Sequence, residues 1–93
     1  MKLIWSDQAG EELIEIEIFV AKDNAMIAAK FIDYLIEQTQ VLLQHPQIGR
    51  IVPEIGNEHI RELIIKNYRI VYRISDQLIE IITVFEGHKL LRF

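Results

Sequence analysis

One segment of the chain, residues 61–73, constrains the fold more than any other. It reads RELIIKNYRIVYR, two short runs of apolar, largely β-branched and aromatic residues separated by the polar pair Lys66-Asn67. Two such runs across a two-residue polar turn are typical of a β-hairpin. Arg69 and Arg73 lie inside the second run, not at its ends. Cations placed within a strand indicate a surface that meets an anion, a carboxylate or a protein partner.

The first half of the chain predicts a pair of helices. Ser6 or Asp7 is suited to begin a helix, with apolar residues recurring behind it at helical spacing. Asn24 is suited to begin a second helix, which ends at His45-Pro46 because the residue before proline disfavours helical dihedral angles. The short break between these helices predicts an antiparallel helical hairpin.

The remaining segments predict strands and therefore an α+β fold. Short strands are expected at residues 2–5, 60–65, 68–74 and 78–86, with a loop over residues 46–59. The element order is then β-α-α-β-β-β. This order predicts a small antiparallel β-sheet with the N-terminal α-helical hairpin packed on one face.

Because side chains alternate across a strand, the turns sort the residues onto two faces. With two-residue turns at Lys66-Asn67 and Asp76-Gln77, Tyr72 opposes Ile81, Ile70 opposes Thr83 and Arg73 opposes Glu80. The face expected beneath the helices holds Leu63, Ile65, Tyr68, Ile70, Tyr72, Ile74, Ile79, Ile81 and Phe85. The open face holds Glu62, Ile64, Arg69, Val71, Arg73, Glu80, Ile82 and Val84.

Composition restricts the class of protein. Residues 1–93 are expected to form one domain, and an apolar fraction of 51% is more than so small a domain can bury, which predicts an exposed partner surface. The sequence pI of about 5.3 does not favour specific DNA binding. No signal peptide or membrane helix is recognisable, so the expected location is the cytoplasm. The chain has no cysteine, its three histidines lack ligand spacing, and no nucleotide-binding motif occurs, so neither metal nor cofactor is expected.

Several of these segments together resemble the RelE/ParE superfamily of type II toxins. The resemblance covers nearly the whole chain, including the opening strand with Trp5, the helix pair, the turn at residues 46–50, and the hairpin with Tyr68-Arg69-Ile70-Val71-Tyr72-Arg73. It implies a small sheet carrying a helical hairpin and a toxin that an antitoxin protein wraps and neutralises. The antitoxin uses an apolar helix or an extended segment for this purpose.

The superfamily contains two mechanisms, and the sequence favours one of them. RelE-like members are ribosome-dependent mRNA endonucleases, whereas ParE-like members inhibit DNA gyrase without cleaving nucleic acid. Arg69 matches the arginine that steadies the phosphate in the endonucleases, and His88 and Glu86 are the further catalytic candidates on that reading. Few other endonuclease groups are present, and Phe93 has no hydroxyl. The ParE-like interpretation is therefore preferred, with the endonuclease and a degenerate antitoxin-binding module as alternatives.

The sequence also indicates candidate surface residues for contact with the target and with the antitoxin. Candidates for contact with the target, which is gyrase or alternatively the ribosome and its mRNA, are Arg50, Arg61, Arg69, Arg73, His88 and Lys89. Candidates for contact with the antitoxin are Ile14, Ile18, Ile64, Val71, Ile82 and Val84. Structural interpretations are open as well. Arg73 is expected to pair with Glu80, Arg69 to pair with Glu62 or Glu86 if it does not meet a partner, and Arg50 to anchor its loop. Arg61 is expected to bind loop carbonyls, and Ile14 and Ile18 to pack under the second helix.

Overall fold

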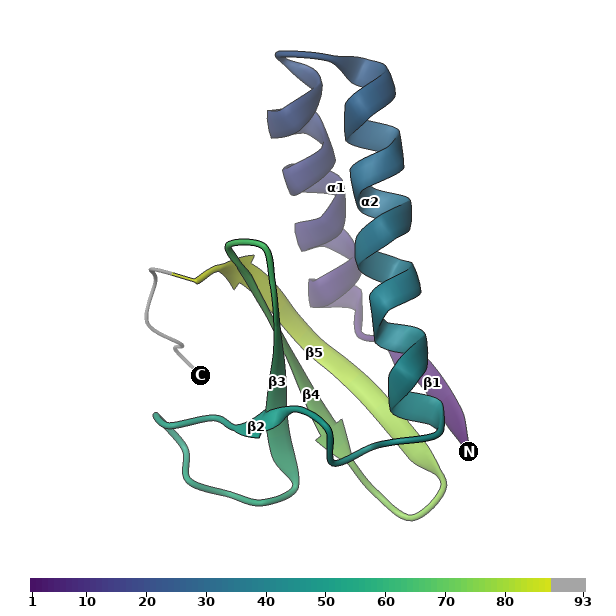
Figure 1. Ribbon diagram of the computed structural model, residues 1–93, viewed down its shortest axis with the longest axis vertical. Coiled ribbons are helices and arrows are strands. Elements are labelled where there is room, and N and C mark those ends of the chain that lie inside the picture. Colours follow the sequence, from purple (N-terminus) through teal and green to yellow (C-terminus); the bar gives the residue numbers. More distant parts are fainter. Residues whose placement is uncertain (88–93) are drawn as a thin grey trace.

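A computed structural model describes residues 1–87, and in that range two long helices stand against one face of a five-stranded sheet (Figure 1). The elements are β1 (Lys2–Trp5), α1 (Asp7–Ala21), α2 (Ala25–Thr39), the short 3₁₀ helix η1 (Gln40–Leu43), β2 (Arg50–Ile51), β3 (Ile60–Ile65), β4 (Tyr68–Ile74) and β5 (Leu78–Glu86). The α+β class and the β-α-α-β-β-β order are confirmed. The two-residue strand β2 is an addition within the predicted loop.

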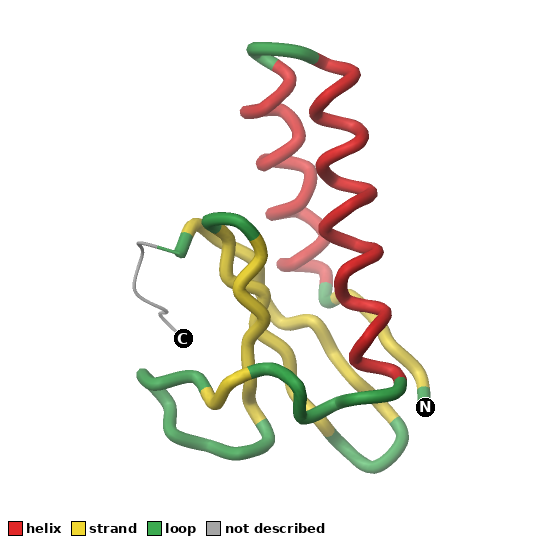
Figure 2. Tube along the Cα trace, viewed as in Figure 1, coloured by secondary structure: helices red, strands yellow, loops and turns green. Residues whose placement is uncertain are grey.

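Both helices begin where the sequence predicted. The side chain of Ser6 accepts a hydrogen bond from the Ala9 N–H at 3.0 Å, and that of Asn24 accepts one from the Ile27 N–H at 3.0 Å. These bonds satisfy N–H groups that have no partner within the helix. The second helix tightens into η1 after Thr39 and ends ahead of Pro46. The two helices of the hairpin are the red segments of Figure 2, and a short green loop joins them.

The strand order in the sheet is β1-β5-β4-β3-β2. Three of the strand pairs are antiparallel, as predicted, but β1 pairs with β5 in parallel orientation, so the sheet is mixed. A tight turn joins only antiparallel neighbours. Because the chain leaves β1 through the helical hairpin, β5 is free to lie beside it in the parallel direction.

The predicted register of the first hairpin is confirmed. Ile65 lies opposite Tyr68 and Arg61 opposite Tyr72, which makes Lys66-Asn67 the two-residue turn. Lys66 adopts a left-handed conformation with φ of 57°. A residue with positive φ at the first turn position suits the twist of a two-residue hairpin.

The second hairpin departs from the prediction at a β-bulge. Tyr72 opposes Ile81 and Arg73 opposes Glu80 as expected, but Val71 opposes Thr83, so Ile82 is an extra residue on β5. The expected Ile70–Thr83 pair is therefore wrong, and Ile70 opposes Val84 instead. An extra residue exchanges the two faces of the strand beyond it.

The bulge has a direct consequence for the core. Val84 turns toward the helices and is buried, whereas Phe85 lies opposite Arg69 on the other face. The prediction had assigned these two side chains the other way round. The remaining residues expected beneath the helices do pack in or against the core, whose fully buried members include Leu35, Leu42, Ile70, Tyr72, Ile79 and Ile81.

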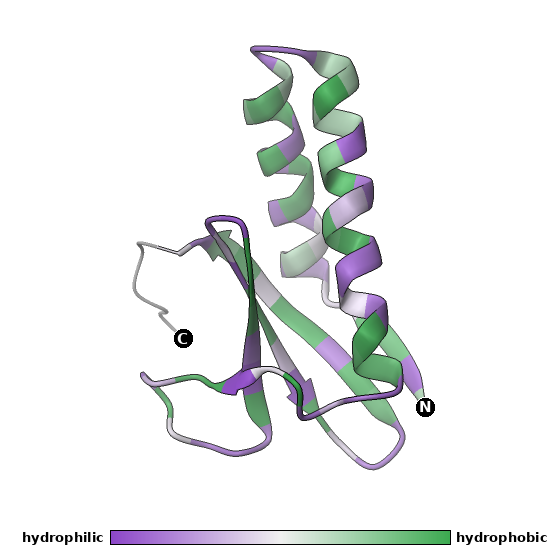
Figure 3. Ribbon diagram, viewed as in Figure 1, coloured by the Kyte–Doolittle hydropathy of each residue, from purple (hydrophilic) through white to green (hydrophobic). Residues whose placement is uncertain are grey.

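The outer half of the helical hairpin extends past the end of the sheet (Figure 1). Apolar positions continue along both helices in this part (Figure 3). Ile14 and Ile18 are 59% and 60% exposed, so the expectation that they pack under the second helix is wrong. Their side of α1 faces neither the sheet nor α2, because the buried stripe of the helix runs through Ala9 and Leu13. Over residues 1–87, neither helix is long and apolar enough to cross a membrane.

Candidate functional site

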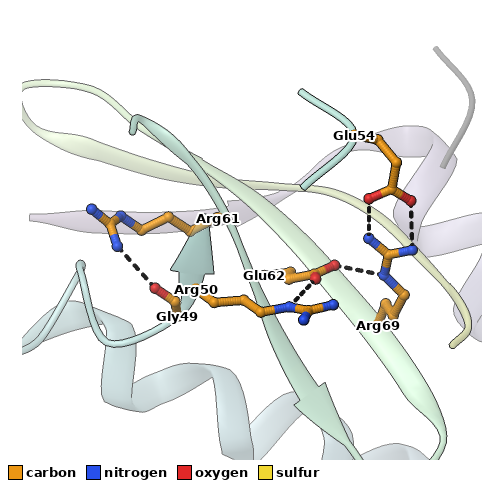
Figure 4. Close-up of polar contacts among 6 residues, drawn as sticks. All are labelled: Gly49, Arg50, Glu54, Arg61, Glu62 and Arg69. Atoms are coloured by element: carbon orange, nitrogen blue, oxygen red, sulfur yellow. Dashed lines mark hydrogen bonds and ion pairs between the residues drawn. The ribbon is translucent and has the colours of Figure 1, made fainter. Parts of the chain in front are cut away.

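The face of the sheet opposite the helices carries a network of charged side chains (Figure 4). At its centre is Arg69 of β4, whose Nε donates to Glu62 of β3 at 2.6 Å. Its two terminal nitrogens donate to the two carboxylate oxygens of Glu54 at 2.7 Å each. Glu54 belongs to the loop between β2 and β3, so this loop is bound to the sheet by a two-bond arginine–carboxylate pair.

Burial makes these interactions strong and mutually dependent. The side chains of Arg69 and Glu62 are 6% and 0% exposed. Arg50 of β2 donates from its Nε to the second oxygen of Glu62 at 2.5 Å. Among residues 1–87, two guanidinium groups thus alternate with two carboxylates. A buried charge without such partners costs several kcal/mol, on the order of 3–5.

The electrostatic environment fixes Arg69 as a cation. The hydrogen bonds from Arg69 to Glu54 and Glu62 raise the pKa of the guanidinium, although burial acts in the opposite direction. The guanidinium carbon also lies 5.1 Å from the centre of the Phe85 ring. This contact exists because the bulge at Ile82 turns Phe85 to this face.

The turn that leads into β2 is anchored by a buried tyrosine. The Tyr72 hydroxyl donates to the Pro46 carbonyl at 2.7 Å and accepts from the Gly49 N–H at 2.9 Å. Burial raises the pKa of this hydroxyl. A Cβ on Gly49 would lie 2.5 Å from the Tyr72 hydroxyl and 2.6 Å from the Glu62 carbonyl oxygen, so only glycine fits this approach.

The other two arginines of the hairpin have different surroundings. Arg61 donates to the carbonyls of Glu58 at 2.9 Å and Gly49 at 3.0 Å, which confirms the expectation that it binds loop carbonyls. Arg73 donates to Glu80 at 2.7 Å, and its side chain is 57% exposed. The predicted Arg73–Glu80 pair is confirmed, and Arg73 remains accessible to a partner.

Comparison with known proteins now identifies the family. The model of the ParE toxin of type II toxin–antitoxin systems matches residues 3–91. The chain belongs to the ParE toxin family. The toxin is therefore one component of a toxin–antitoxin system, which implies an antitoxin partner.

A solved structure, described as the chromosomal ParDE toxin–antitoxin system from P. aeruginosa, shares the fold. It superimposes with a TM-score of 0.77 at 22% sequence identity and covers 92% of this toxin and 95% of the other chain. At this identity the likeness establishes the fold alone. A search among curated proteins returned no match.

The structure divides the target-contact candidates into two groups. Arg50 and Arg73 present exposed guanidinium groups, whereas Arg69 is buried and Arg61 is bound to the loop. The expectation that Arg69 lies open in the middle of a surface is wrong, because Glu54 and Glu62 enclose it. His88 and Lys89 lie outside the described residues.

The structure also divides the antitoxin-contact candidates. Ile14, Ile18 and Ile64 are between 51% and 60% exposed, and Ile82 is half-buried. Val71 and Val84 are at most 1% exposed, so neither is accessible as expected. Val71 does lie on the predicted face away from the helices, opposite Glu62, whereas Val84 does not. For Val84 the reason is the bulge, which turns it into the core.

Glu54 is the important site residue that sequence reasoning missed. It lies 15 residues from Arg69 in a loop with no periodic pattern, so strand alternation could not assign it. A signal was nevertheless available, since a buried strand arginine requires a carboxylate and Glu54 is a loop acid near the hairpin. Within residues 1–87, no three histidine, cysteine, aspartate or glutamate side chains gather closely enough to bind a metal.

Proposed function

We propose that this toxin inhibits DNA gyrase through protein contacts and is neutralised in the cytoplasm by an antitoxin. The family supports the toxin role, and the state of Arg69 supports the target. This is the arginine that, by resemblance to the endonucleases, would steady a phosphate. Here two carboxylates enclose it, and its side chain is 6% exposed.

Phosphate binding at Arg69 would require the loss of the Glu54 pair. A phosphate approaching the network would also meet the negative charge of Glu54, whose side chain is 24% exposed, before reaching the guanidinium. The acidic net charge of −4 repels nucleic acid at longer range. A mechanism based on protein recognition has neither difficulty, which favours gyrase over the ribosome-bound message as the target.

Arg73 and Arg50 are the cations best placed to contact gyrase. Both side chains are 57% exposed, and each has one carboxylate partner. The exposed pair between Arg73 and Glu80 contributes only about 0–1 kcal/mol, so Arg73 can exchange Glu80 for a carboxylate on a partner protein. Arg50 is bound to the buried Glu62 and can contact a partner only with the part of its side chain that is exposed. This makes Arg73 and Arg50 the first positions to substitute.

A supercoiling assay tests the target. Purified toxin at micromolar concentration is expected to inhibit gyrase, and Arg73→Ala to raise the concentration needed by about tenfold, the effect of losing one interfacial charge contact. Lys30→Ala, which removes an exposed cation on α2, is the matched control and should inhibit like the wild type. Full gyrase activity in the presence of folded toxin would reject the proposal.

Two further measurements separate the alternatives. Primer extension on a translated message would reveal codon-located cuts if the toxin were an endonuclease, and Arg69→Ala would abolish them. Growth inhibition on expression, relieved by co-expression of an adjacent antitoxin gene, is expected for an active toxin. Normal growth with soluble toxin, together with no cleavage, would instead identify a module that only binds the antitoxin.

A further inference from the structure

The side chain of Arg50 is held through one nitrogen and open at the other two. Its Nε donates to one oxygen of Glu62 at 2.5 Å, and the Glu62 side chain is fully buried. Within residues 1–87, neither terminal nitrogen of Arg50 has a hydrogen bond or an ion pair, and Figure 4 shows a bond from its Nε alone. The side chain is 57% exposed, which lets water solvate these two nitrogens. Arg50 therefore presents a fork of two nitrogens to the outside of the molecule.

The buried network holds this fork in one orientation. The second oxygen of Glu62 accepts from the Nε of Arg69 at 2.6 Å, and Glu54 binds the other two nitrogens of Arg69. Glu62 is thus fixed from two sides, and it fixes Arg50 in turn. A side chain that is already immobilised loses less conformational freedom when it binds a partner, and this favours binding.

Arg73, the other exposed arginine of this face, is arranged differently. It donates to Glu80 from one of its terminal nitrogens, at 2.7 Å. A ligand that used both terminal nitrogens of Arg73 would have to displace Glu80. Arg50 keeps its bond to Glu62 through Nε and can add a ligand to its terminal nitrogens without losing that bond.

The surroundings of Arg50 favour a protein as the ligand. Arg50 lies at the edge of the sheet, because β2 is the last strand in the order. It is opposite Glu62, and Ile64 lies two residues further along β3 on the same face. Ile64 is 51% exposed. An arginine beside an exposed apolar side chain is suited to a protein contact, whereas a nucleic-acid backbone would leave Ile64 in water.

We propose that the two terminal nitrogens of Arg50 bind the carboxylate of an aspartate or glutamate on gyrase, and that an apolar side chain of the same partner covers Ile64. This inference rests on the proposed function and adds the chemical class of the contact and its geometry. The two parallel N–H groups of the fork match the two oxygens of a carboxylate. A lysine at position 50 would keep the charge, but its single ammonium on Glu62 would leave no planar pair of N–H groups for the partner.

Hydrogen exchange of the arginine side chains tests the fixed orientation without gyrase. Proton–nitrogen NMR spectra of full-length toxin resolve the Nε–H groups. The Nε–H of Arg50 is expected to exchange with solvent at least about tenfold more slowly than that of Arg73, because only the former is bound to a buried carboxylate. Equal exchange rates would show that Arg50 is not held by Glu62 and would overturn the proposal.

Surface plasmon resonance with gyrase, in the absence of DNA, tests the contact. Arg50→Lys is expected to raise the Kd by about tenfold. Arg73→Lys should raise it by at most about threefold, because an ammonium can replace a contact made through a single nitrogen. An affinity of folded Arg50→Lys equal to that of the wild type, with folding verified by circular dichroism, would overturn the proposal.

Ile64→Ser tests the apolar part of the surface. It should raise the Kd by about fivefold or more, because it removes apolar contact area. The matched control Ile27→Ser changes an isoleucine of similar exposure on α2 and should alter the Kd by less than about twofold. Equal effects of the two substitutions would reject Ile64 as part of the contact.

The remaining outcomes separate this contact from the proposed function. If Arg50→Lys weakened the inhibition of supercoiling but left gyrase binding without DNA unchanged, the fork would be assigned to a DNA phosphate and the carboxylate would be rejected. Wild-type toxin that did not bind gyrase would reject the proposed function and this contact together. Inhibition and binding that Arg50→Lys left unchanged would remove only the contact and retain gyrase as the target.

Discussion

The two faces of the sheet are closed by different forces. On the face toward the helices, apolar side chains such as Leu35, Ile70 and Ile79 are fully buried against one another. On the opposite face, a loop is attached through Glu54, Arg69 and Glu62. Apolar contact depends mainly on area and tolerates changes of shape. A buried charge network depends on every member, because the loss of one leaves another charge unpaired.

This difference explains why Arg69 and Arg73, which both belong to β4, have different roles. Arg69 and Arg73 point to the same face of β4, but only Arg69 is covered by the loop. Burial under the loop gives Arg69 a structural role, whereas Arg73 remains exposed and can contact a partner protein. The same strand thus supplies part of the fold and part of the proposed contact surface.

The largest expected effect tests the charged face. Arg69→Met leaves Glu62 buried with only the exposed Arg50 as its partner, and the free energy of unfolding should fall by about 3–5 kcal/mol. Arg73→Met makes the same change in an exposed pair on the same strand and should cost less than about 1 kcal/mol. Urea denaturation measures both. Similar losses for the two variants would show that burial does not distinguish the arginines.

The next effect tests the apolar face. Leu35→Ala removes a fully buried side chain and should lower the free energy of unfolding by about 2–5 kcal/mol, with little dependence on salt. Ile36→Ala, at the neighbouring position that is 36% exposed, should cost about 1 kcal/mol or less. A strong salt dependence for Leu35→Ala would mean that charges also close this face.

Tyr72 connects the two faces, since its ring lies in the core and its hydroxyl anchors the turn before β2. Tyr72→Phe leaves the Gly49 N–H and the Pro46 carbonyl without this partner and should cost about 1–3 kcal/mol. Tyr34→Phe, at an exposed position on α2, is the control and should have little effect.

Alkaline pH offers a second measurement on Tyr72. Unfolded tyrosine loses its proton at about pH 10, whereas the raised pKa of Tyr72 retains the proton to higher pH in the folded state. Its contribution to stability is therefore complete below about pH 10 and is lost as the pH rises toward the folded pKa. Tyr72→Phe should reduce the decline in stability above about pH 10. An unchanged decline would assign the alkaline transition to other groups.

The smallest expected effect is at the first hairpin turn. Lys66→Gly should raise the free energy of unfolding by less than about 1 kcal/mol, because glycine adopts the observed φ of 57° without strain, while the greater freedom of glycine in the unfolded chain and the loss of the contact between the Lys66 ammonium and the Tyr34 ring offset part of the gain. Gln77→Gly in the second turn lacks this advantage and should be neutral or slightly destabilising. Thermal denaturation of both variants would measure the difference, and a loss of stability in Lys66→Gly would contradict the strain argument.

The sequence alone determined the parts of this fold that depend on neighbours in the chain. Ser6 and Asn24 begin their helices through bonds to residues three positions ahead, and Lys66-Asn67 sets the pairing of the strands beside it. Alternation then assigned Arg69 and Arg73 to the face away from the helices. These features follow from local geometry and from the period of the apolar pattern, both of which can be read from the residues.

Tertiary structure decided the features that depend on distant segments. The bulge at Ile82 places Val84 in the core and Phe85 on the opposite face of the sheet. Strict alternation of side chains along β5 had predicted the reverse. The loop placed Glu54 on Arg69, and the projection of the helical hairpin past the sheet left Ile18 exposed. The first two features depend on contacts between segments far apart in the chain, and the third depends on the absence of such a contact. No local pattern specifies such a contact, so burial of an arginine and exposure of an isoleucine emerged only when the chain was folded.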